Sequence, residues 1–389
     1  MRKAQEPVHV LVVFNGLCLY GMERSVIETF DLLRPEVAPH FLIQRSNDRY
    51  DTALLRELKK RNFSLSFFSD TWDWPRLGKP HSFVDLVKML WCLVVANCDV
   101  FRACLRNDVI YLPVFSSAYL AFVSCLYYRL LNRKVIYFFH DVASKPSLKL
   151  MPAVWGSSDL VHCAERSRQM ARSANPRIED RINHVIPPCI EIRSSGTLDL
   201  SRWQSKRIIL FVGQVSAHKG LDLLAEAFLS LRGRYQDVAL HIVGGCQAQF
   251  PPWFERLLGA AVGVDVKYWG YVDNVHDLFR AAYIYVHPSP PSRFHESFGR
   301  GVVEAMALGI PAVCFKSGPL DEIVVHERTG LVCEQESAAC LAENLSRMLD
   351  DAHFRAACSE RAIQRYDECY SNGPIRAAWL QLLCSRRGL

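Results

Sequence analysis

Short apolar runs alternate with longer amphipathic segments along the whole chain. The run at residues 9–14 is followed by a segment with helical spacing at 21–33, and the runs at 107–113 and 134–141 enclose another at 116–131. Short apolar runs are typical of buried strands, and apolar positions three to four residues apart are typical of helices. The pattern therefore predicts an α/β fold with doubly wound parallel sheets.

The alternation stops around residues 187–206, where prolines, serines and a glycine gather. That composition is typical of a linker, which we place at 191–205. We expect one Rossmann-like domain at 1–190 and another at 206–373, with a C-terminal helix at about 374–389 packing on the first. Ligands of such sheets bind beyond the carboxyl ends of the strands, so a central cleft between the domains is the expected site.

Two apolar stretches raise the question of a membrane. Residues 109–128 carry no charge, but Pro113 and the Ser116–Ser117 pair interrupt them. This favours a buried strand ending near Leu112 and a helix beginning near Ser116, with a membrane span as the alternative.

The other apolar stretch is a helix expected at residues 82–105, after a loop with Trp72, Trp74, Arg76 and Lys79. One interpretation is a packed helix under an aromatic loop. The alternative is a patch that rests on a membrane surface, with tryptophans at the interface and cations near the lipid headgroups.

Composition narrows the class of protein. The chain has 389 residues, a net charge of +6 and a pI of about 8.6, which suits anionic small molecules or an anionic membrane surface. The basic excess is too small to argue for nucleic acid, which we do not expect as a partner. The 14 cysteines are scattered without metal-ligand spacing, and the N-terminal apolar run resembles a strand more than a signal peptide. We therefore expect reduced thiols in a cytoplasmic protein.

The segment 295–313, "HESFGRGVVEAMALGIPAV", carries the candidate chemistry. It follows the predicted strand at 283–287, and we expect its helix to begin near Ser297. A helix start offers backbone N–H groups and the positive end of the helix dipole, which suit a phosphate. Gly299 and Gly301 leave room for a ligand to approach the backbone. Amides for phosphate and carboxylates for hydroxyls predict a site for a phosphorylated sugar or a nucleotide.

The two acids of this segment also have an ordinary interpretation. Glu296 is then an acid favoured by the helix dipole, and Glu304 is a solvated surface residue. However, Glu304 stands among small and apolar residues, where a charge is costly unless it is paired. This favours a functional role.

The segment resembles the E-x7-E motif of retaining GT-B glycosyltransferases of glycosyltransferase family 4 type. Other stretches resemble further motifs of that family, in the same order along the chain. They are "YGMERSVIETF" (GG-x-E-R), "YFFHD" (a strand ending in an active-site histidine), "FVGQVSAHKGLDLLAEAF" (GR-x4-KG) and "HIVGG" (a G-x-G-type turn). The resemblance implies the GT-B fold, with an N-terminal acceptor domain and a C-terminal donor domain.

The resemblance also implies a role for each matching residue. Glu296 would hold hydroxyls of the donor sugar, Glu304 the ribose hydroxyls, and Lys219 the diphosphate. His140 would face the donor sugar, and Gly21 would let its loop approach the phosphate and the acceptor. The diphosphate would be received by the backbone amides of Ser297, Phe298 and Gly299, near the strand-end turns at Gly213, Gln214 and Gly244.

Positive groups at the leaving diphosphate stabilise the transition state, so we expect no metal and no cofactor other than the nucleotide-diphosphate sugar as co-substrate. Family enzymes are thought to react on one face of the sugar, with the diphosphate helping to deprotonate the acceptor. The chain departs from the family at Gln214, which stands where an arginine is usual, at Tyr20 in place of a glycine, and at residues 187–191. His218, Arg293 or Arg300 would have to supply the missing charge.

Two candidate residues have ordinary alternatives. His140 is a core or surface histidine in the simpler interpretation, but it ends a strand, where ligands bind. Lys219 is a surface lysine at a helix start in the simpler interpretation. Because helix starts bind anions, as expected near Ser297, Lys219 is alternatively a phosphate ligand.

The favoured function is transfer of a sugar from a nucleotide-diphosphate donor to a hydroxyl acceptor, either a saccharide or lipid-linked. The setting would be bacterial polysaccharide or glycolipid assembly, in the cytoplasm or peripheral to the inner face of the membrane. A dinucleotide oxidoreductase is the second candidate, although "FNGLCLYG" lacks G-x-G-x-x-G. A nucleotide-sugar-binding protein with degenerate catalysis is the third. The sequence does not identify the sugar, the base, the acceptor or the linkage.

Overall fold

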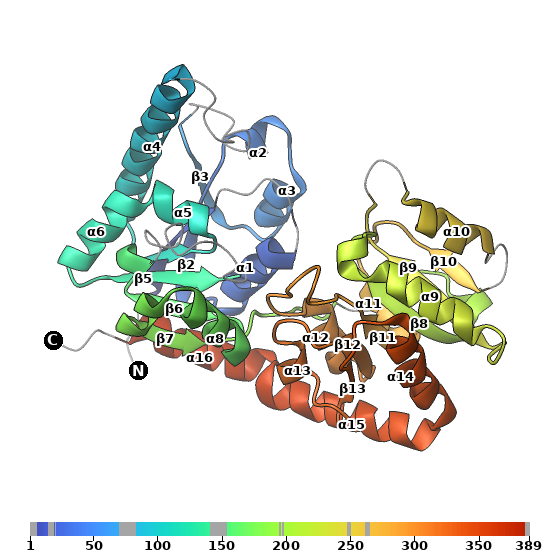
Figure 1. Cartoon of the computed structure of the whole chain (residues 1–389). Helices are drawn as coiled ribbons and strands as arrows, with labels where there is room; N and C mark the ends of the chain where they lie inside the picture. The colour runs from blue at the N-terminus through green and yellow to red at the C-terminus, as the bar shows by residue number, and fades with distance from the viewer. Residues whose placement is uncertain are drawn as a thin grey trace. The chain divides into compact units, whose positions relative to one another are not determined.

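The computed structural model describes residues 6–14, 19, 21–69, 83–140, 154–193, 196, 198–246, 250–260 and 265–385. The chain divides by its contacts into two compact units (Figure 1). Unit 1 comprises Met1–Cys189 with Asn372–Leu389, and unit 2 comprises Ile190–Ser371.

Unit 1 is built on a seven-stranded parallel sheet in the order β3-β2-β1-β4-β5-β6-β7. Its central strands are almost wholly apolar, as expected for a sheet covered by helices on both faces. The strands are β1 (Val8–Phe14), β2 (Val37–Ile43), β3 (Ser64–Phe67), β4 (Val109–Leu112), β5 (Lys134–Phe139), β6 (Asp159–His162) and β7 (Ile182–Val185). The helices are α1 (Gly21–Leu32), α2 (Ser46–Arg49), α3 (Ala53–Lys60), α4 (Phe83–Cys104), α5 (Phe115–Leu120), α6 (Phe122–Leu130), α8 (Glu165–Ala174), the 3-10 turn η2 (Pro176–Asp180) and α16 (Asn372–Cys384).

Unit 2 repeats this plan with a six-stranded parallel sheet in the order β10-β9-β8-β11-β12-β13. The strands are β8 (Arg207–Val212), β9 (Val238–Val243), β10 (Val266–Tyr268), β11 (Ala282–His287), β12 (Ala312–Phe315) and β13 (Gly330–Cys333). The helices are α9 (Leu221–Leu231), α10 (Pro252–Ala260), α11 (His276–Ala281), α12 (Arg300–Ala307), α13 (Leu320–Ile323), α14 (Ala338–Asp350) and α15 (Ala352–Cys369), with the 3-10 turns η3 (Ser201–Trp203) and η4 (Ala217–Lys219).

The two sheets confirm the predicted fold class, two Rossmann-like α/β units with parallel strands. The uncharged stretch 109–128 is a strand followed by helices, as expected, but the single helix predicted from Ser116 is broken at Ala121 into α5 and α6. Over the ranges given above, none of the helices has both the length and the apolar composition needed to cross a bilayer. Trp72, Trp74, Arg76 and Lys79 lie outside the described residues.

Several residues of the stretch predicted as a linker are fixed on unit 2. The Arg193 amide donates to Nδ1 of His276 at 3.1 Å, and the Gly196 amide donates to Oδ1 of Asp277 at 2.8 Å. Trp203 is buried, and its ring contacts the edge of His241 with 4.6 Å between centroids. The C-terminal helix α16 is grouped with unit 1, where Trp379 packs against Tyr111 and Phe138.

Candidate functional site

The connection from β11 to α12 in unit 2 forms the candidate site. Strand β11 ends at His287, and α12 begins at Arg300, three residues later than the sequence suggests. The N-cap is Gly299, with a φ of 101°, a left-handed conformation that favours glycine. Glycine has no side chain to accept from the first turn of the helix, and the Val302 and Val303 amides of that turn donate to the Gly299 carbonyl at 2.9 and 3.4 Å.

Three side chains converge on one oxygen of Glu296. Oε1 accepts from Nζ of Lys219 at 2.7 Å, from Nε2 of His287 at 2.9 Å and from Oγ of Ser289 at 2.6 Å. Nδ1 of His287 in turn lies 3.1 Å from the hydroxyl of Tyr285, so both ring nitrogens of His287 have a partner. The carboxylate is therefore buried and fixed in orientation.

The second oxygen of Glu296, Oε2, has no hydrogen-bond donor among the residues that the structure describes. Burial alone would raise the pKa of Glu296, but the neighbouring His287 and the Lys219 ammonium outweigh burial and hold the pKa well below its usual range. The group is therefore an ionised acceptor whose second oxygen is available to a ligand.

Glu304 repeats this arrangement about one turn into α12. Its Oε1 accepts from Nε of Arg300 at 2.8 Å and lies 3.9 Å from Nε2 of His276. Burial would raise the pKa of Glu304, but the Arg300 guanidinium, with a smaller contribution from His276, lowers it overall. Within the described part of the chain, Oε2 of Glu304 also accepts no hydrogen bond.

The orientation of His276 is set from the stretch predicted as a linker. Because Nδ1 of His276 accepts the backbone N–H of Arg193, a neutral ring carries its proton on Nε2, the nitrogen that faces Glu304. The Arg193 amide is about 110 residues from Glu304 in sequence. By selecting the tautomer of His276, it thus contributes to the electrostatics around the Glu304 carboxylate.

The two glycines near the helix start have a packing role that the sequence did not indicate. A Cβ atom on Gly301 would lie 2.2 Å from the Tyr285 hydroxyl, and one on Gly299 would lie 2.4 Å from Cδ2 of Leu320. Packing against Tyr285 and Leu320 therefore explains both glycines without a ligand, and the approach of a ligand stays a prediction. The role of the backbone amides stays a prediction.

The other predicted residues of unit 2 lie at strand ends. Gly213 follows β8 and Gly244 follows β9, and a Cβ atom on Gly244 would lie 2.0 Å from the Gly213 carbonyl oxygen, so these two turns touch. Gln214 is exposed, and Phe298 is buried against Tyr370. Ser297 is half-buried, directly after Glu296.

Two predicted residues belong to unit 1. His140 directly follows β5, its ring contacts Phe138 with 4.0 Å between centroids, and its Nε2 is buried without a partner among the described residues. Burial lowers the pKa of His140 to about 3. Gly21 is exposed at the first position of α1. Tyr20 and Asp141 lie outside the described residues.

Sequence reasoning did not assign roles to Ser289, His276 or His287. The Arg300–Glu304 pair has a readable signal, because residues four apart face each other on a helix. The contact between Lys219 and Glu296 joins residues 77 apart, and no local pattern indicates it.

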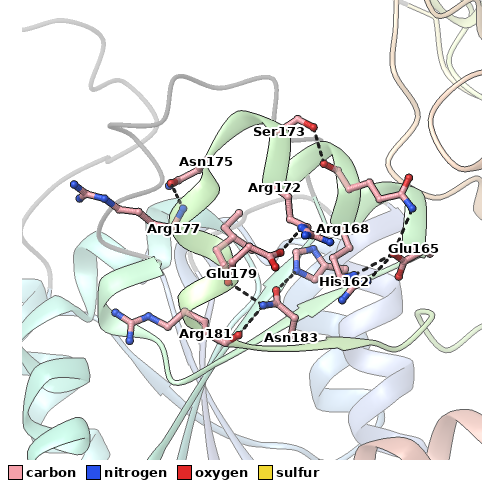
Figure 2. Close-up of polar contacts among 12 residues, drawn as sticks. His162, Glu165, Arg168, Arg172, Ser173, Asn175, Arg177, Glu179, Arg181 and Asn183 are labelled. Atoms are coloured by element: carbon pink, nitrogen blue, oxygen red, sulfur yellow. Dashed lines mark hydrogen bonds and ion pairs between the residues drawn. The ribbon is translucent and has the colours of Figure 1, made fainter.

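A second polar cluster lies in unit 1 around α8 and η2 (Figure 2). His162 contacts Asn183 at 2.9 Å, Arg168 pairs with Glu165 at 2.8 Å, and Arg172 pairs with Glu179. These contacts join β6, α8, η2 and β7 beside a shallow hollow of about 400 Å³. Its charges pair with one another, which indicates a structural network.

One protein family matches a large part of unit 2. Residues 200–365 match the family described as "Glycosyl transferases group 1". A glycosyltransferase of Haemophilus influenzae is 27% identical over 203 residues, covering 50% of this chain and 54% of that protein. The D-inositol 3-phosphate glycosyltransferase of Corynebacterium glutamicum is 30% identical over 203 residues, covering 48% and 47%. The chain thus matches about half the length of these relatives.

Solved structures are similar over nearly the whole chain. Anabaena Alr3699/HepE in complex with UDP and glucose has a TM-score of 0.76 at 19% identity, covering 97% of this chain and 99% of that one. Sucrose-phosphate synthase from Thermosynechococcus elongatus has a TM-score of 0.74 at 16% identity, covering 96% and 98%. At these identities the likeness shows the fold of GT-B glycosyltransferases.

Proposed function

We propose that the protein is a retaining glycosyltransferase that moves a sugar from a nucleotide-diphosphate sugar to a hydroxyl acceptor. The observation that carries this proposal is the pair of buried carboxylates, Glu296 and Glu304. Each is held through one oxygen by a cation of its own unit, and each leaves the other oxygen without a donor among the described residues. Such an oxygen can accept a hydrogen bond from a ligand hydroxyl, and a nucleotide sugar offers hydroxyls on both its hexose and its ribose.

The surroundings of the carboxylates suit the diphosphate between those two sugars. The start of α12 lies between Glu296 and Glu304 in sequence, and it would present the positive end of the helix dipole to an anion. The Lys219 ammonium is already bound to Glu296, and Ser289 and His287 would keep that carboxylate in place when Lys219 turns to a phosphate. These groups stabilise charge on the leaving diphosphate, the largest catalytic contribution in many enzymes.

In the proposed reaction, the bond between the anomeric carbon and the diphosphate oxygen breaks, and the acceptor oxygen bonds to that carbon on the same face. The acceptor proton goes to the leaving diphosphate. His140 would face the donor sugar, and a lipid-linked or saccharide acceptor would be used in bacterial polysaccharide or glycolipid assembly, with peripheral membrane contact. The relatives are named as glycosyltransferases, and HepE was crystallised with UDP and glucose, which supports a nucleotide-sugar donor.

A donor screen tests the proposal. The protein is incubated with UDP-, GDP- and TDP-linked sugars and a panel of hydroxyl acceptors, and mass spectrometry reads which donor is hydrolysed or transferred. We expect turnover of one donor class, unchanged by a chelator, since Lys219 and the helix start supply the positive charge. Turnover that stops with chelator and returns with a divalent metal would contradict the metal-independent form of the proposal.

The carboxylates are tested by a matched pair of substitutions. Glu304→Gln keeps the shape but removes the ionised acceptor, and we expect at least about a tenfold loss of donor affinity in calorimetry. Glu255→Gln on α10 removes an exposed carboxylate of the same unit and is expected to change nothing. Equal donor affinity in both variants would remove Glu304 from the site.

A second candidate function rests on Gln214, which is exposed where the resemblance expects an arginine. A protein that binds nucleotide sugars without transferring them fits that loss of charge. Calorimetric binding of a donor, with no turnover on any acceptor of the panel, would favour this candidate over the transferase.

A further inference from the structure

Helix α4 of unit 1 has its apolar side turned outward. Phe83, Val84, Val87, Leu90, Trp91 and Val94 are all exposed, Phe83 by 78% and Trp91 by 63%. With helical spacing these six side chains fall on one face, and the opposite face is buried through Cys92, Val100 and Cys104. In Figure 1 this N-terminal half of α4 extends past α5 and α6.

Helix α6 adds a second exposed apolar row beside α4. Val123, Leu126 and Leu130 lie three to four residues apart and are exposed, Leu130 by 85%. The two helices pack together, and the Tyr128 hydroxyl ties the end of α6 to the Cys104 carbonyl at 2.6 Å. We call the exposed sides of these two helices the α4–α6 face.

This face is unusual within the protein. More than half of the exposed large apolar side chains in the described part of the chain lie between residues 83 and 131. Single exposed apolar residues are normal on soluble proteins, but a contiguous patch marks an interaction surface. A patch on a helix too polar to cross a bilayer fits an interfacial contact.

The charges on the α4–α6 face favour an anionic partner. Residues 83–133 carry five cationic side chains, three aspartates and no glutamate. Asp99 accepts from Ser69 and pairs with Arg102 at 3.4 Å, and Asp108 accepts from the His9 amide. The cations are exposed, and Arg106, Arg129 and Arg133 flank the exposed leucines at the joined ends of the helices.

We propose that the α4–α6 face docks on an anionic lipid bilayer, with α4 lying in the interface and its apolar side chains inserted among the acyl chains. Trp91 and Phe83 would occupy the headgroup boundary, and the arginines would contact lipid phosphates. Pairing of two copies through this face would bring a net positive surface against itself, whereas an anionic bilayer supplies the opposite charge. This docking does not require the proposed transfer activity.

Vesicle co-sedimentation tests the docking without any sugar donor. The full chain is mixed with vesicles of phosphatidylcholine alone, or of phosphatidylcholine with an equal amount of phosphatidylglycerol. We expect binding to the anionic vesicles that weakens as salt is raised, because salt screens the arginine–lipid attraction. Equal binding to both kinds of vesicle would overturn the assignment to an anionic surface.

Matched variants locate the surface. Trp91→Asp is expected to weaken vesicle binding by about tenfold or more, since one aromatic side chain inserted into a bilayer contributes that much to the binding free energy. Tyr50→Asp removes an aromatic side chain of equal exposure, 64%, elsewhere in unit 1 and is expected to bind as the parent does. Val94→Asp provides a second surface variant, and circular dichroism confirms that each variant is folded.

Two further outcomes decide the proposal. Arg106→Glu is expected to reduce the preference for anionic over neutral vesicles, because Arg106 is exposed at the end of α4. Sedimentation velocity without lipid is expected to show a monomer. A dimer that Trp91→Asp dissociates, together with no binding to vesicles, would overturn the lipid assignment in favour of a second copy of the chain.

Discussion

Strand β11 of unit 2 ends at a histidine and strand β5 of unit 1 is directly followed by one, and the protein surrounds these two histidines differently. His287 uses both ring nitrogens, one with Tyr285 and one with Glu296. His140 is buried against Phe138, and among the described residues nothing bonds its Nε2.

The difference concerns these two rings: both nitrogens of His287 have a side-chain partner, whereas Nε2 of His140 is buried without one among the described residues. A buried unpaired nitrogen costs free energy, so a protein retains one where a ligand or a rearrangement satisfies it. Substitutions at the candidate site of unit 2 are thus expected to lower activity, mainly because charge stabilisation is lost. Substitution of His140 in unit 1 is expected to change the free energy of unfolding as well as activity.

Lys219→Ala is expected to give the largest effect, by breaking the candidate site of unit 2. The substitution removes the cation nearest Glu296 and the proposed diphosphate ligand. We expect kcat for transfer to fall by about a hundredfold or more, the size found when one preorganised group is lost from a charge-stabilising site.

Lys316→Ala serves as its control, since Lys316 is a half-exposed lysine of the same unit with only long ion pairs, to Asp321 at 3.8 Å and Glu334 at 3.9 Å. Circular dichroism should show both variants folded. Full transfer activity in Lys219→Ala would remove this lysine from the site.

His140→Phe tests the unsatisfied group of unit 1 with two opposed readouts. We expect kcat to fall by about tenfold to a hundredfold if His140 faces the donor sugar, while the free energy of unfolding at neutral pH rises by about 1 kcal/mol. A structural histidine would change stability without changing kcat. An unchanged kcat would therefore assign His140 to the core alone.

The same variant has a defined pH dependence. The pKa of His140 is lowered from 6.5 to about 3, so the folded protein binds fewer protons than the unfolded chain below pH 6.5. The stability of the parent then falls as the pH drops through that range, by about 2 kcal/mol at about pH 5 from this group. Calorimetric unfolding should show the gap between His140→Phe and the parent widening by that amount. A constant gap would mean that His140 is not held neutral.

Much of the fold was predictable because buried parallel strands are continuous apolar runs between helices. The E-x7-E spacing and the strand end at His140 were also visible in the sequence. The start of α12 was misplaced because Gly299 bends the chain before Arg300 with a φ of 101°. The break at Ala121 was missed because both sides of it are equally apolar.

The partners within the site were not predictable. Ser289 and Lys219 reach Glu296 from seven and 77 residues away, and their contact depends on how β8 and β11 pair in the sheet. Gly301 was interpreted only as room for a ligand, and the sequence did not show that the Tyr285 hydroxyl lies where a side chain would be. A local sequence pattern shows which residues are small or charged, but the pairing of the strands determines which residues they contact.

Gln214→Arg is a further test of the candidate site in unit 2, and it has the smallest expected effect of the substitutions proposed. Gln214 is exposed after β8, and an arginine there would add a cation to a site that already has Lys219. We expect the affinity for the nucleotide-sugar donor to rise by about threefold to tenfold, the value of one partly exposed charge-assisted hydrogen bond. Gln335→Arg adds the same charge at an exposed position before α14. This control separates the effect of a local contact with the donor from the effect of a more positive electrostatic potential over the whole unit. An equal gain in both variants would show that Gln214 does not face the diphosphate, because only a local contact depends on position.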